Sequence, residues 1–219
     1  ERGEDFVGDG VWVQSAMLCA DLMAYAALTE AGITPDLVTG HSYGDYAALV
    51  ASEVLTLQDA LLLTRARAES VMRARVEGGM ASIGAGQDKV RSLLVDGAWI
   101  ANINAPDATV IAGRHDAVKA VMDKAEAEGL TAQRLLVPGP FHSPLMEPAR
   151  ATLADALEAV PFSAPRMPFL SSVSRRFEED PARLRQLLET QLCEPVDWVA
   201  QVERLYDDGL RCFVEVGPK

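Results

Sequence analysis

The sequence has few cysteines, the residues that form the disulfides of small secreted domains and bind metal clusters. Only three cysteines occur among its 219 residues, and Cys19, Cys193 and Cys212 lie far apart with no CxxC pair. A disulfide framework or a zinc cluster is therefore not expected, and a reducing, cytoplasmic setting fits best. The charged start of the chain is unlike a signal peptide. No apolar run reaches the roughly 20 residues that cross a bilayer, so we expect no membrane span.

Basic residues are also scarce. The chain has 20 Lys+Arg against 32 Asp+Glu, a formal net charge of −12 and a pI near 4.7. Nucleic acid is an improbable partner, because its phosphates repel an acidic protein. Hydrophobic residues make up 49% and charged residues 24%, which is typical of a globular protein. The length suffices for one domain, or for one domain carrying a smaller subdomain.

The first and last thirds of the chain alternate helices with short strands. Apolar periodicity and breakers predict helices over 14–31, 45–51, 57–76, 144–160, 182–192 and 196–208, and core strands over 37–39, 169–173 and 212–216. Gly32 is the expected stop of the first helix and Gly78-Gly79 that of the third. Such alternation predicts an α/β protein with a mostly parallel sheet covered by helices on both faces.

Residues 79–137 follow a different rhythm. Strands are expected over 80–84, 99–104, 109–113 and 131–137, with helices over 87–95 and 116–128. The order β-α-β-β-α-β is the split βαβ of ferredoxin-like units. We therefore expect a small subdomain over 79–137, inserted into a larger part made of 1–78 and 138–219.

Gly40-x-Ser42-x-Gly44 lies between an expected strand and an expected helix, where a nucleophile elbow is found. The sharp turn would expose the serine hydroxyl, and small residues on both sides would let strand and helix approach. Backbone N–H groups at the helix start could stabilise an oxyanion. The alternative is an ordinary turn with a helix-capping serine.

A nucleophilic serine needs a base, and the chain has three histidines. His41 adjoins the serine and is expected to be a packing or turn residue, while His115 lies in a polar turn and is expected to be solvated. His142 lies in a loop rich in proline and glycine, which would hold a base in one position. By elimination His142 is the candidate base; a buried structural histidine is the alternative.

Arg67 falls on the apolar face of the helix predicted over 57–76. A buried arginine is costly unless it is paired, and a carboxylate can satisfy it with two hydrogen bonds. Spacing alone favours an internal salt bridge or a snorkelling surface arginine. Substrate binding is the other reading.

Several segments together resemble the malonyl-CoA:acyl-carrier-protein acyltransferases, which include the acyltransferase domains of fatty-acid and polyketide synthases. The matching residues are Gly40-His41-Ser42-Tyr43-Gly44-Asp45, Arg67 at 25 positions after Ser42, Phe141-His142-Ser143, and Val214-Glu215-Val216-Gly217-Pro218. The likeness runs from Gln14 to the end of the chain. It implies an α/β-hydrolase-like core with an inserted ferredoxin-like subdomain, and an enzyme that is an acyltransferase.

The resemblance gives roles to the residues that match. Ser42 would carry the acyl group, His142 would act first as base and then as acid, and Arg67 would bind the free carboxylate of a malonyl-type substrate. Tyr43 would donate its backbone N–H to the oxyanion hole. Phe141 would narrow the acyl pocket and so favour malonyl over methylmalonyl.

Three further residues match less central positions of the family. Gln14 would lie near the acyl pocket, Asn104 would lie near the cleft, and the main-chain carbonyl of Gln191 would orient the histidine. No acidic third member of a triad would then be needed.

The sequence departs from the family pattern at several points. The early Gly-Gln-Gly segment that supplies a second oxyanion donor is missing, and the chain stops at Lys219 where the family continues, so we expect a fragment of a longer domain. Asp45 stands where the family usually has Glu. Gly139-Pro140 before Phe141 is unlike modular polyketide synthases and points to an iterative polyketide synthase or a polyunsaturated fatty-acid synthase.

The implied reaction moves a malonyl-type unit from coenzyme A to the phosphopantetheine thiol of an acyl carrier protein through an acyl-Ser42 intermediate. The implied partners are acyl-CoA, the carrier protein and flanking synthase domains, with no bound cofactor or metal. Carrier docking would use Arg73 and Arg75, or Arg175 and Arg176, unless these are simply a solvated face. The other functions left open are a serine hydrolase of the esterase or thioesterase type, and an inactive carrier-binding domain.

Overall fold

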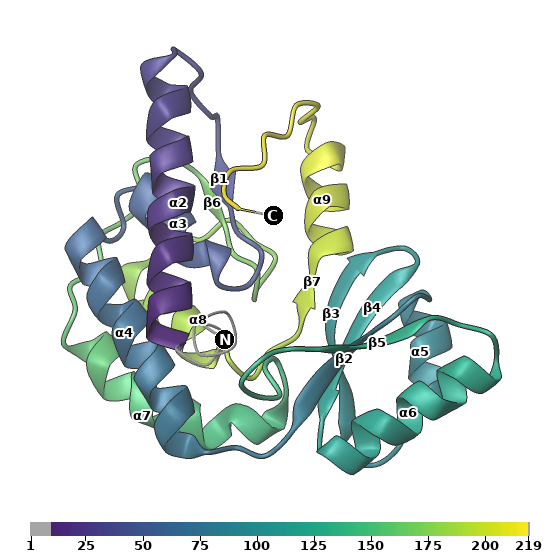
Figure 1. Cartoon of the computed structure of the whole chain (residues 1–219). Helices are drawn as coiled ribbons and strands as arrows, with labels where there is room; N and C mark the ends of the chain where they lie inside the picture. The colour runs from purple at the N-terminus through teal and green to yellow at the C-terminus, as the bar shows by residue number, and fades with distance from the viewer. Residues whose placement is uncertain (1–9, 219) are drawn as a thin grey trace, which may run out of the picture.

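The computed structural model describes residues 10–218, which form a larger and a smaller part (Figure 1). The larger part contains α2 (Gly10–Glu30), β1 (Val38–Thr39), α3 (Gly44–Ala51), α4 (Leu57–Ala74), the 3₁₀ turn η1 (Pro144–Met146), α7 (Glu147–Glu158), β6 (Phe169–Leu170), α8 (Pro181–Thr190) and α9 (Trp198–Asp207). The smaller part contains β2 (Gly79–Ile83), α5 (Gln87–Leu93), β3 (Ala98–Ala105), β4 (Ala108–Gly113), α6 (His115–Ala127) and β5 (Ala132–Leu135). The class is α/β, as predicted.

Helix α4 shows how the sequence sets the element boundaries. The Thr56 hydroxyl accepts a hydrogen bond from the Asp59 N–H at 3.1 Å and caps the first turn. One face of the helix is buried against α2 and α7. The helix ends where Arg75 adopts a left-handed conformation with φ 46°. The expected stop at Gly78-Gly79 is therefore wrong: the backbone turns three residues earlier, at a non-glycine residue.

The smaller part has one sheet with the strand order β5-β2-β4-β3-β7. Strand β2 pairs antiparallel with β4 and β5, and β3 pairs antiparallel with β4. Helices α5 and α6 pack on this sheet around a core of small and branched residues, among them Ile83, Ile111 and Val121. The element order β-α-β-β-α-β agrees with the one predicted for 79–137.

The fifth strand of that sheet comes from outside the predicted range. Strand β7 (Val196–Asp197) pairs parallel with Asn102 and Ile103 of β3. The helix predicted over 196–208 therefore begins two residues later, at Trp198. Asp197 explains the boundary, because its side chain accepts a hydrogen bond from the Ala200 N–H at 3.0 Å and caps α9.

The larger part does not contain the extended parallel sheet expected from the sequence. Among the described residues its sheet is the parallel pair β1–β6, two residues in each strand. The strand predicted over 212–216 is also wrong. This segment of the larger part is irregular, and Phe213 and Val214 are 48% and 56% exposed. Its apolar alternation is typical of a strand, but no described strand pairs with it in a hydrogen-bonded ladder. Figure 1 shows this yellow segment running back from α9 toward β1.

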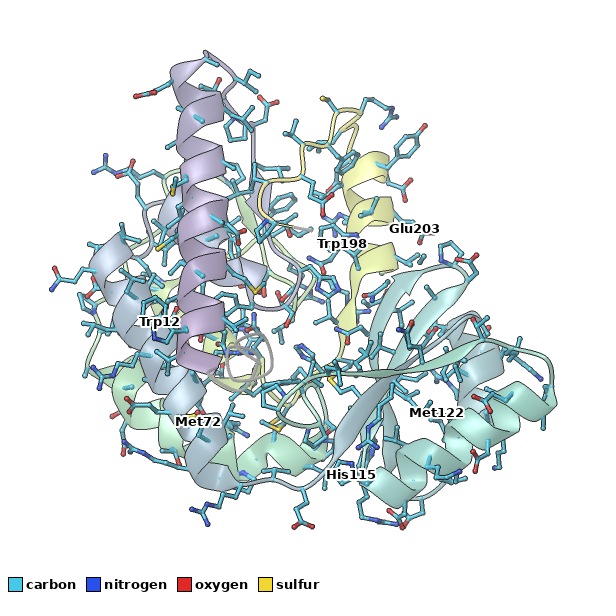
Figure 2. The ribbon with its side chains drawn as sticks, in the orientation of Figure 1. Trp12, Met72, His115, Met122, Trp198 and Glu203 are labelled. Carbon is cyan, nitrogen blue, oxygen red and sulfur yellow. The ribbon has the colours of Figure 1, made fainter. Side chains whose placement is uncertain are left out.

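Helix α2 departs from the expectation that no stretch of the chain is long and apolar enough to span a membrane. An 18-residue window within its 21 residues has a mean hydropathy of 1.4, so by length and composition the helix could cross a membrane. Leu18 is its one buried residue among those described, and Trp12 at its start, labelled in Figure 2, is 64% exposed. The helix packs against α3 and α4. Core helices of globular proteins pass the same length and composition test, so this feature alone does not place the chain in a membrane.

Candidate active site

The nucleophile elbow joins β1 to α3, and Ser42 at its tip has φ 54°, a left-handed conformation that is strained for a residue with a side chain. A Cβ atom on Gly40 would lie 2.1 Å from the Asp45 backbone nitrogen, so only glycine lets strand and helix approach this closely. A Cβ atom on Gly44 would meet no atom within 4 Å. The expectation that both glycines are needed for close approach is therefore wrong for Gly44, the first residue of α3, where a side chain would find open space.

The structure brings Ser42 and His142 together. The Ser42 Oγ and the His142 Nε2 lie 2.7 Å apart, although the residues are 100 positions apart in the sequence. His142 is 4% exposed and has φ 60°, and its backbone N–H donates to the Leu192 carbonyl at 2.8 Å. The loop thus holds the imidazole in one position, as a general base requires.

Two main-chain carbonyls fix the other ring nitrogen. His142 Nδ1 lies 2.9 Å from the Glu194 oxygen and 3.1 Å from the Gln191 oxygen. Because carbonyls only accept, Nδ1 carries the proton and Nε2 is free to accept the Ser42 hydroxyl proton. The family resemblance implied the Gln191 carbonyl as a partner of this ring, and the structure shows the contact. The Glu194 carbonyl was missed, since a backbone oxygen leaves no signature in the sequence.

Burial sets the charge state of this histidine. The pKa of His142 is lowered to about 4, mainly by desolvation; Arg67 and the neighbouring His41 act in the same direction, and the two carbonyl hydrogen bonds act against it. The imidazole is therefore neutral near pH 7. A neutral imidazole can take up a proton, so the ring is ready to act as a base.

Arg67 is buried between residues that flank the serine and the histidine. It is 4% exposed, and its guanidinium carbon lies 5.4 Å from the ring centres of both Tyr43 and Phe141. Its one hydrogen bond from the guanidinium among the described residues goes to the Gln14 Oε1 at 2.7 Å. Burial lowers the pKa of Arg67. Neither a salt bridge to a carboxylate of the described chain nor a snorkelling surface position is found, which excludes both alternatives within residues 10–218.

Tyr43 has its side chain and its backbone in different roles. The hydroxyl is hydrogen-bonded to the Gln14 carbonyl at 3.0 Å and to the Thr64 Oγ1 at 2.7 Å, and the ring stacks on Tyr46. These contacts lock the residue after the nucleophile. The Tyr43 backbone N–H donates to no other group of residues 10–218, so it is available to a ligand oxygen beside Ser42.

Asn104 lies on the smaller part and reaches the elbow through His41, not through the serine or the base. The His41 Nε2 and the Asn104 Oδ1 lie 2.7 Å apart, and the His41 ring stands edge-on to Trp198 with ring centres 5.6 Å apart. Figure 2 labels Trp198 at the start of α9. His41 thus packs in the turn, as expected, and also links the two parts of the molecule.

The remaining candidates lie away from this cluster. His115 begins α6 and is exposed, with its Nδ1 accepting from Arg134 at 2.8 Å (Figure 2). Of the arginines suggested for docking, Arg73 pairs with Glu69 and Arg175 pairs with Asp197, each at 3.1 Å. Within residues 10–218 there is no cluster of three or more His, Cys, Asp or Glu side chains that could hold a metal ion.

A serine on a sharp strand–helix turn, hydrogen-bonded to a neutral histidine, is the arrangement of proteins that form acyl-serine intermediates. Comparison with known proteins narrows this class. The acyl transferase domain family matches residues 5–219, and the chain belongs to this family. The resemblance predicted from the sequence is thereby confirmed.

Individual relatives agree with this assignment. The chain is 34% identical over 215 residues to the malonyl CoA-acyl carrier protein transacylase of Bacillus subtilis, covering 94% of this chain and 68% of that protein. It is 34% identical over 209 residues to a phenolphthiocerol synthesis type I polyketide synthase of Mycobacterium marinum, covering 94% of this chain but 10% of the synthase. The solved malonyl CoA-acyl carrier protein transacylase of Coxiella burnetii superposes with a TM-score of 0.93 at 30% identity, covering 99% of this chain and 72% of that one.

Proposed function

We propose that this chain transfers a malonyl-type acyl group from coenzyme A to the phosphopantetheine thiol of an acyl carrier protein, in the cytoplasm and as a domain of a polyketide synthase. Ser42 is the nucleophile, His142 the base and acid, and Arg67 the group that binds the free carboxylate. The relatives named above carry out malonyl transfer or polyketide synthesis by name, which supports the substrate and the context.

The observation that carries the proposal is that the buried Arg67 guanidinium has no anionic partner among residues 10–218. The guanidinium has been taken out of water, yet its partners within these residues are one amide oxygen and two aromatic rings. Burying a charge without a counter-charge is costly, so such a group is retained where a ligand supplies the missing charge. A carboxylate at one end of a short acyl chain would pair with Arg67 while its thioester lies at Ser42.

The chemistry follows from the ring nitrogens. His142 Nε2 takes the Ser42 hydroxyl proton as Oγ attacks the thioester carbonyl, and the oxyanion accepts the Tyr43 backbone N–H. The intermediate collapses, the coenzyme A thiolate leaves, and it recovers the proton from His142. In the second half, the carrier thiol gives its proton to His142 and attacks the malonyl ester, and Ser42 leaves with that proton.

Arg67 also serves transfer over hydrolysis. A carboxylate held at the far end of the acyl chain fixes the ester carbonyl in one orientation, in which the carrier thiol can approach it. An acetyl group offers no carboxylate and would leave the buried cation unpaired, so it would be selected against. Phe141, in contact with the guanidinium, would limit branching beside the malonyl methylene.

We further propose that residues 79–137 are a ferredoxin-like subdomain inserted into an α/β-hydrolase-like core of 1–78 and 138–219. The strand order β5-β2-β4-β3 and the elbow between β1 and α3 support this division. Asn104 and Gln14 are proposed to border the acyl group, one from each part. Flanking synthase domains belong to the same proposal.

Intact-mass measurement tests the function. The protein is incubated with malonyl-, methylmalonyl- and acetyl-CoA, with and without a carrier protein bearing phosphopantetheine, and Ser42→Ala is the matched control. We expect one malonyl unit on the wild type, none on Ser42→Ala, and its movement to the carrier. Free malonate in place of malonyl-carrier would establish a hydrolase, and no adduct with any acyl-CoA would refute the acyl-serine route.

A further inference from the structure

Beneath the elbow lies a buried network that the proposed mechanism does not use. Asp45, Ser172 and Gln191 are 2%, 0% and 1% exposed. The Asp45 Oδ2 accepts hydrogen bonds from the Ser172 hydroxyl, from the Ser172 backbone N–H at 3.2 Å and from the Gln191 Nε2 at 3.0 Å. Helix α3, the loop after β6 and the end of α8 meet at this one carboxylate oxygen.

Gln191 connects that carboxylate to both members of the serine–histidine pair. Its Nε2 also donates to the Ser42 main-chain carbonyl at 2.9 Å, so both amide hydrogens are used. Its own main-chain carbonyl accepts from His142 Nδ1 at 3.1 Å. One residue therefore touches the backbone of the nucleophile and the ring of the base. Its side-chain amide is held between the Ser42 carbonyl and Asp45.

Burying the Asp45 carboxylate at this position lowers the stability of the fold. Within residues 10–218 no cation lies within ion-pair distance of it, and its Oδ1 has no hydrogen-bond partner. Burial raises the pKa of Asp45 to about 7, although hydrogen bonding to Ser172, to Gln191 and to the Gly40 backbone lowers it. Its place in the first turn of α3 offsets part of the cost, because the positive end of a helix favours an anion. A hydrophobic residue would fill the site at lower cost, so the carboxylate is retained for what it holds.

We propose that Asp45 is a positioning residue that acts through Gln191 to keep Ser42 and His142 in reacting geometry. Without the Asp45 oxygen the Gln191 amide loses one of its two acceptors, and its side chain can rotate away from the Ser42 carbonyl. The same rotation shifts the Gln191 backbone that holds His142. The Glu194 carbonyl would still accept from Nδ1 at 2.9 Å, so the ring would keep one anchor. The expected loss of rate is therefore partial.

The inference rests on the proposed serine–histidine pair but not on the proposed substrate, and the test uses a probe that ignores the substrate. A small uncharged fluorophosphonate reacts with an activated serine: Oγ bonds to phosphorus, fluoride leaves, and the hydroxyl proton passes to the base. Its binding constant KI and maximal rate kinact are measured separately by intact mass. The variants are Asp45→Ala, Gln191→Leu and their double mutant.

A matched pair of serine variants controls for the loss of a buried hydroxyl. Ser172→Ala removes one donor to Asp45. Ser52→Ala removes an equally buried hydroxyl at the other end of α3, where it bonds the Ala48 carbonyl at 2.8 Å, and it has no link to the pair. Urea unfolding of each variant measures its stability. If Asp45→Ala does not fold, the serine pair and Gln191→Leu still decide the question.

We expect Asp45→Ala and Gln191→Leu each to lower kinact by about 10- to 100-fold with KI within about twofold, the size of effect that a small misplacement produces. The double mutant should be no slower than the slower single variant, because both remove one linkage. Ser172→Ala should be slower than Ser52→Ala at equal stability.

Wild-type kinact in Asp45→Ala or Gln191→Leu, additive losses in the double mutant, or equal rates in the two serine variants would overturn the inference. A wild-type protein that takes up no phosphonate would overturn the serine–histidine pair and this inference with it. A protein that is labelled normally but accepts no malonyl group would overturn only the proposed substrate.

Discussion

Replacing Arg67 with methionine separates what this side chain does for the empty protein from what it does for the substrate. Methionine keeps most of the length of arginine but carries no charge. In the empty protein the guanidinium has lost its water without gaining a carboxylate of the described chain. The substitution should therefore leave the fold almost unaffected and still abolish recognition of a carboxylate.

The expected change in the free energy of unfolding is small because gains and losses nearly cancel. Exchanging a buried charge for an apolar group of similar volume is neutral or stabilises by about 1–4 kcal/mol. Against this, the charged hydrogen bond to Gln14 is worth about 1.5–3 kcal/mol, and the desolvated contacts with the Tyr43 and Phe141 rings about 2 kcal/mol each, much of which the methionine sulfur recovers against the same rings. We expect a net change below about 2 kcal/mol, measured by urea unfolding.

The effect on acylation is larger, because the missing partner is then a desolvated carboxylate. Removing one member of a buried charge pair costs about 2–5 kcal/mol. At about 1.36 kcal/mol per tenfold, malonyl transfer to Ser42 should slow by roughly 30- to 5,000-fold. Transfer from acetyl-CoA, which has no carboxylate to pair, should change by less than about threefold.

Intact-mass time courses with malonyl-CoA and acetyl-CoA measure both rates on one sample. An unchanged malonyl-to-acetyl ratio in Arg67→Met would remove Arg67 from substrate recognition. A loss of more than about 4 kcal/mol of stability would show instead that the guanidinium is a structural element of the larger part.

Four further outcomes can be measured with the fluorophosphonate and urea. Gly40→Ala should lower the free energy of unfolding by about 1–3 kcal/mol and abolish labelling of Ser42, because the new methyl group would meet backbone atoms. Gly44→Ala, at the first residue of α3, should leave the free energy of unfolding unchanged or raise it by up to about 1 kcal/mol. A larger loss of stability in Gly44→Ala than in Gly40→Ala would contradict the elbow geometry. Because the pKa of His142 is lowered to about 4, labelling should stay level down to about pH 5 and fall to half near pH 4; a midpoint near the ordinary 6.5 would show that the ring is solvated. The same shift makes unfolding easier as pH falls from about 6.5 toward 4, because the unfolded chain binds the proton first. His142→Ala should slow labelling by about 10²- to 10⁴-fold, and an unchanged rate would refute the pair.

The elements of the smaller part could be predicted because each one carries a local signal. Breakers such as Gly86 and Pro106 separate the segments, and the apolar period changes from two to near four between them. Strand β6 was predicted too long, over 169–173, and β7 was predicted as the start of a helix, since a two-residue strand is defined by its neighbour rather than by its own residues. The segment over 212–216 failed for the same reason: its pattern was right for a strand, but a strand also needs a partner.

The residues of the candidate site also fall into those that the sequence could indicate and those that it could not. Ser42 is marked by its glycines and His142 by its rigid loop, so sequence reasoning reached both, and the structure places them in contact. Their catalytic roles stay predictions. The sequence did not show the Glu194 carbonyl or the linkage from Asp45 through Gln191, because both depend on how distant segments meet. For Arg67 the sequence left open a structural role and substrate binding. The structure shows that the side chain is buried and that no carboxylate of the described chain pairs with it.

Strand β7 has a mechanical consequence. Two covalent crossings join the smaller part to the rest, and the hydrogen bonds between β7 and β3 add a third tether. That tether begins two residues after Glu194, whose carbonyl steadies the imidazole. A swinging movement of the smaller part, such as the arrival of a bulky carrier would demand, must therefore either break the β7 pairing or pull on the residues that aim His142. Under the proposed function, carrier docking and the position of the His142 ring would therefore be linked through residues 194–197.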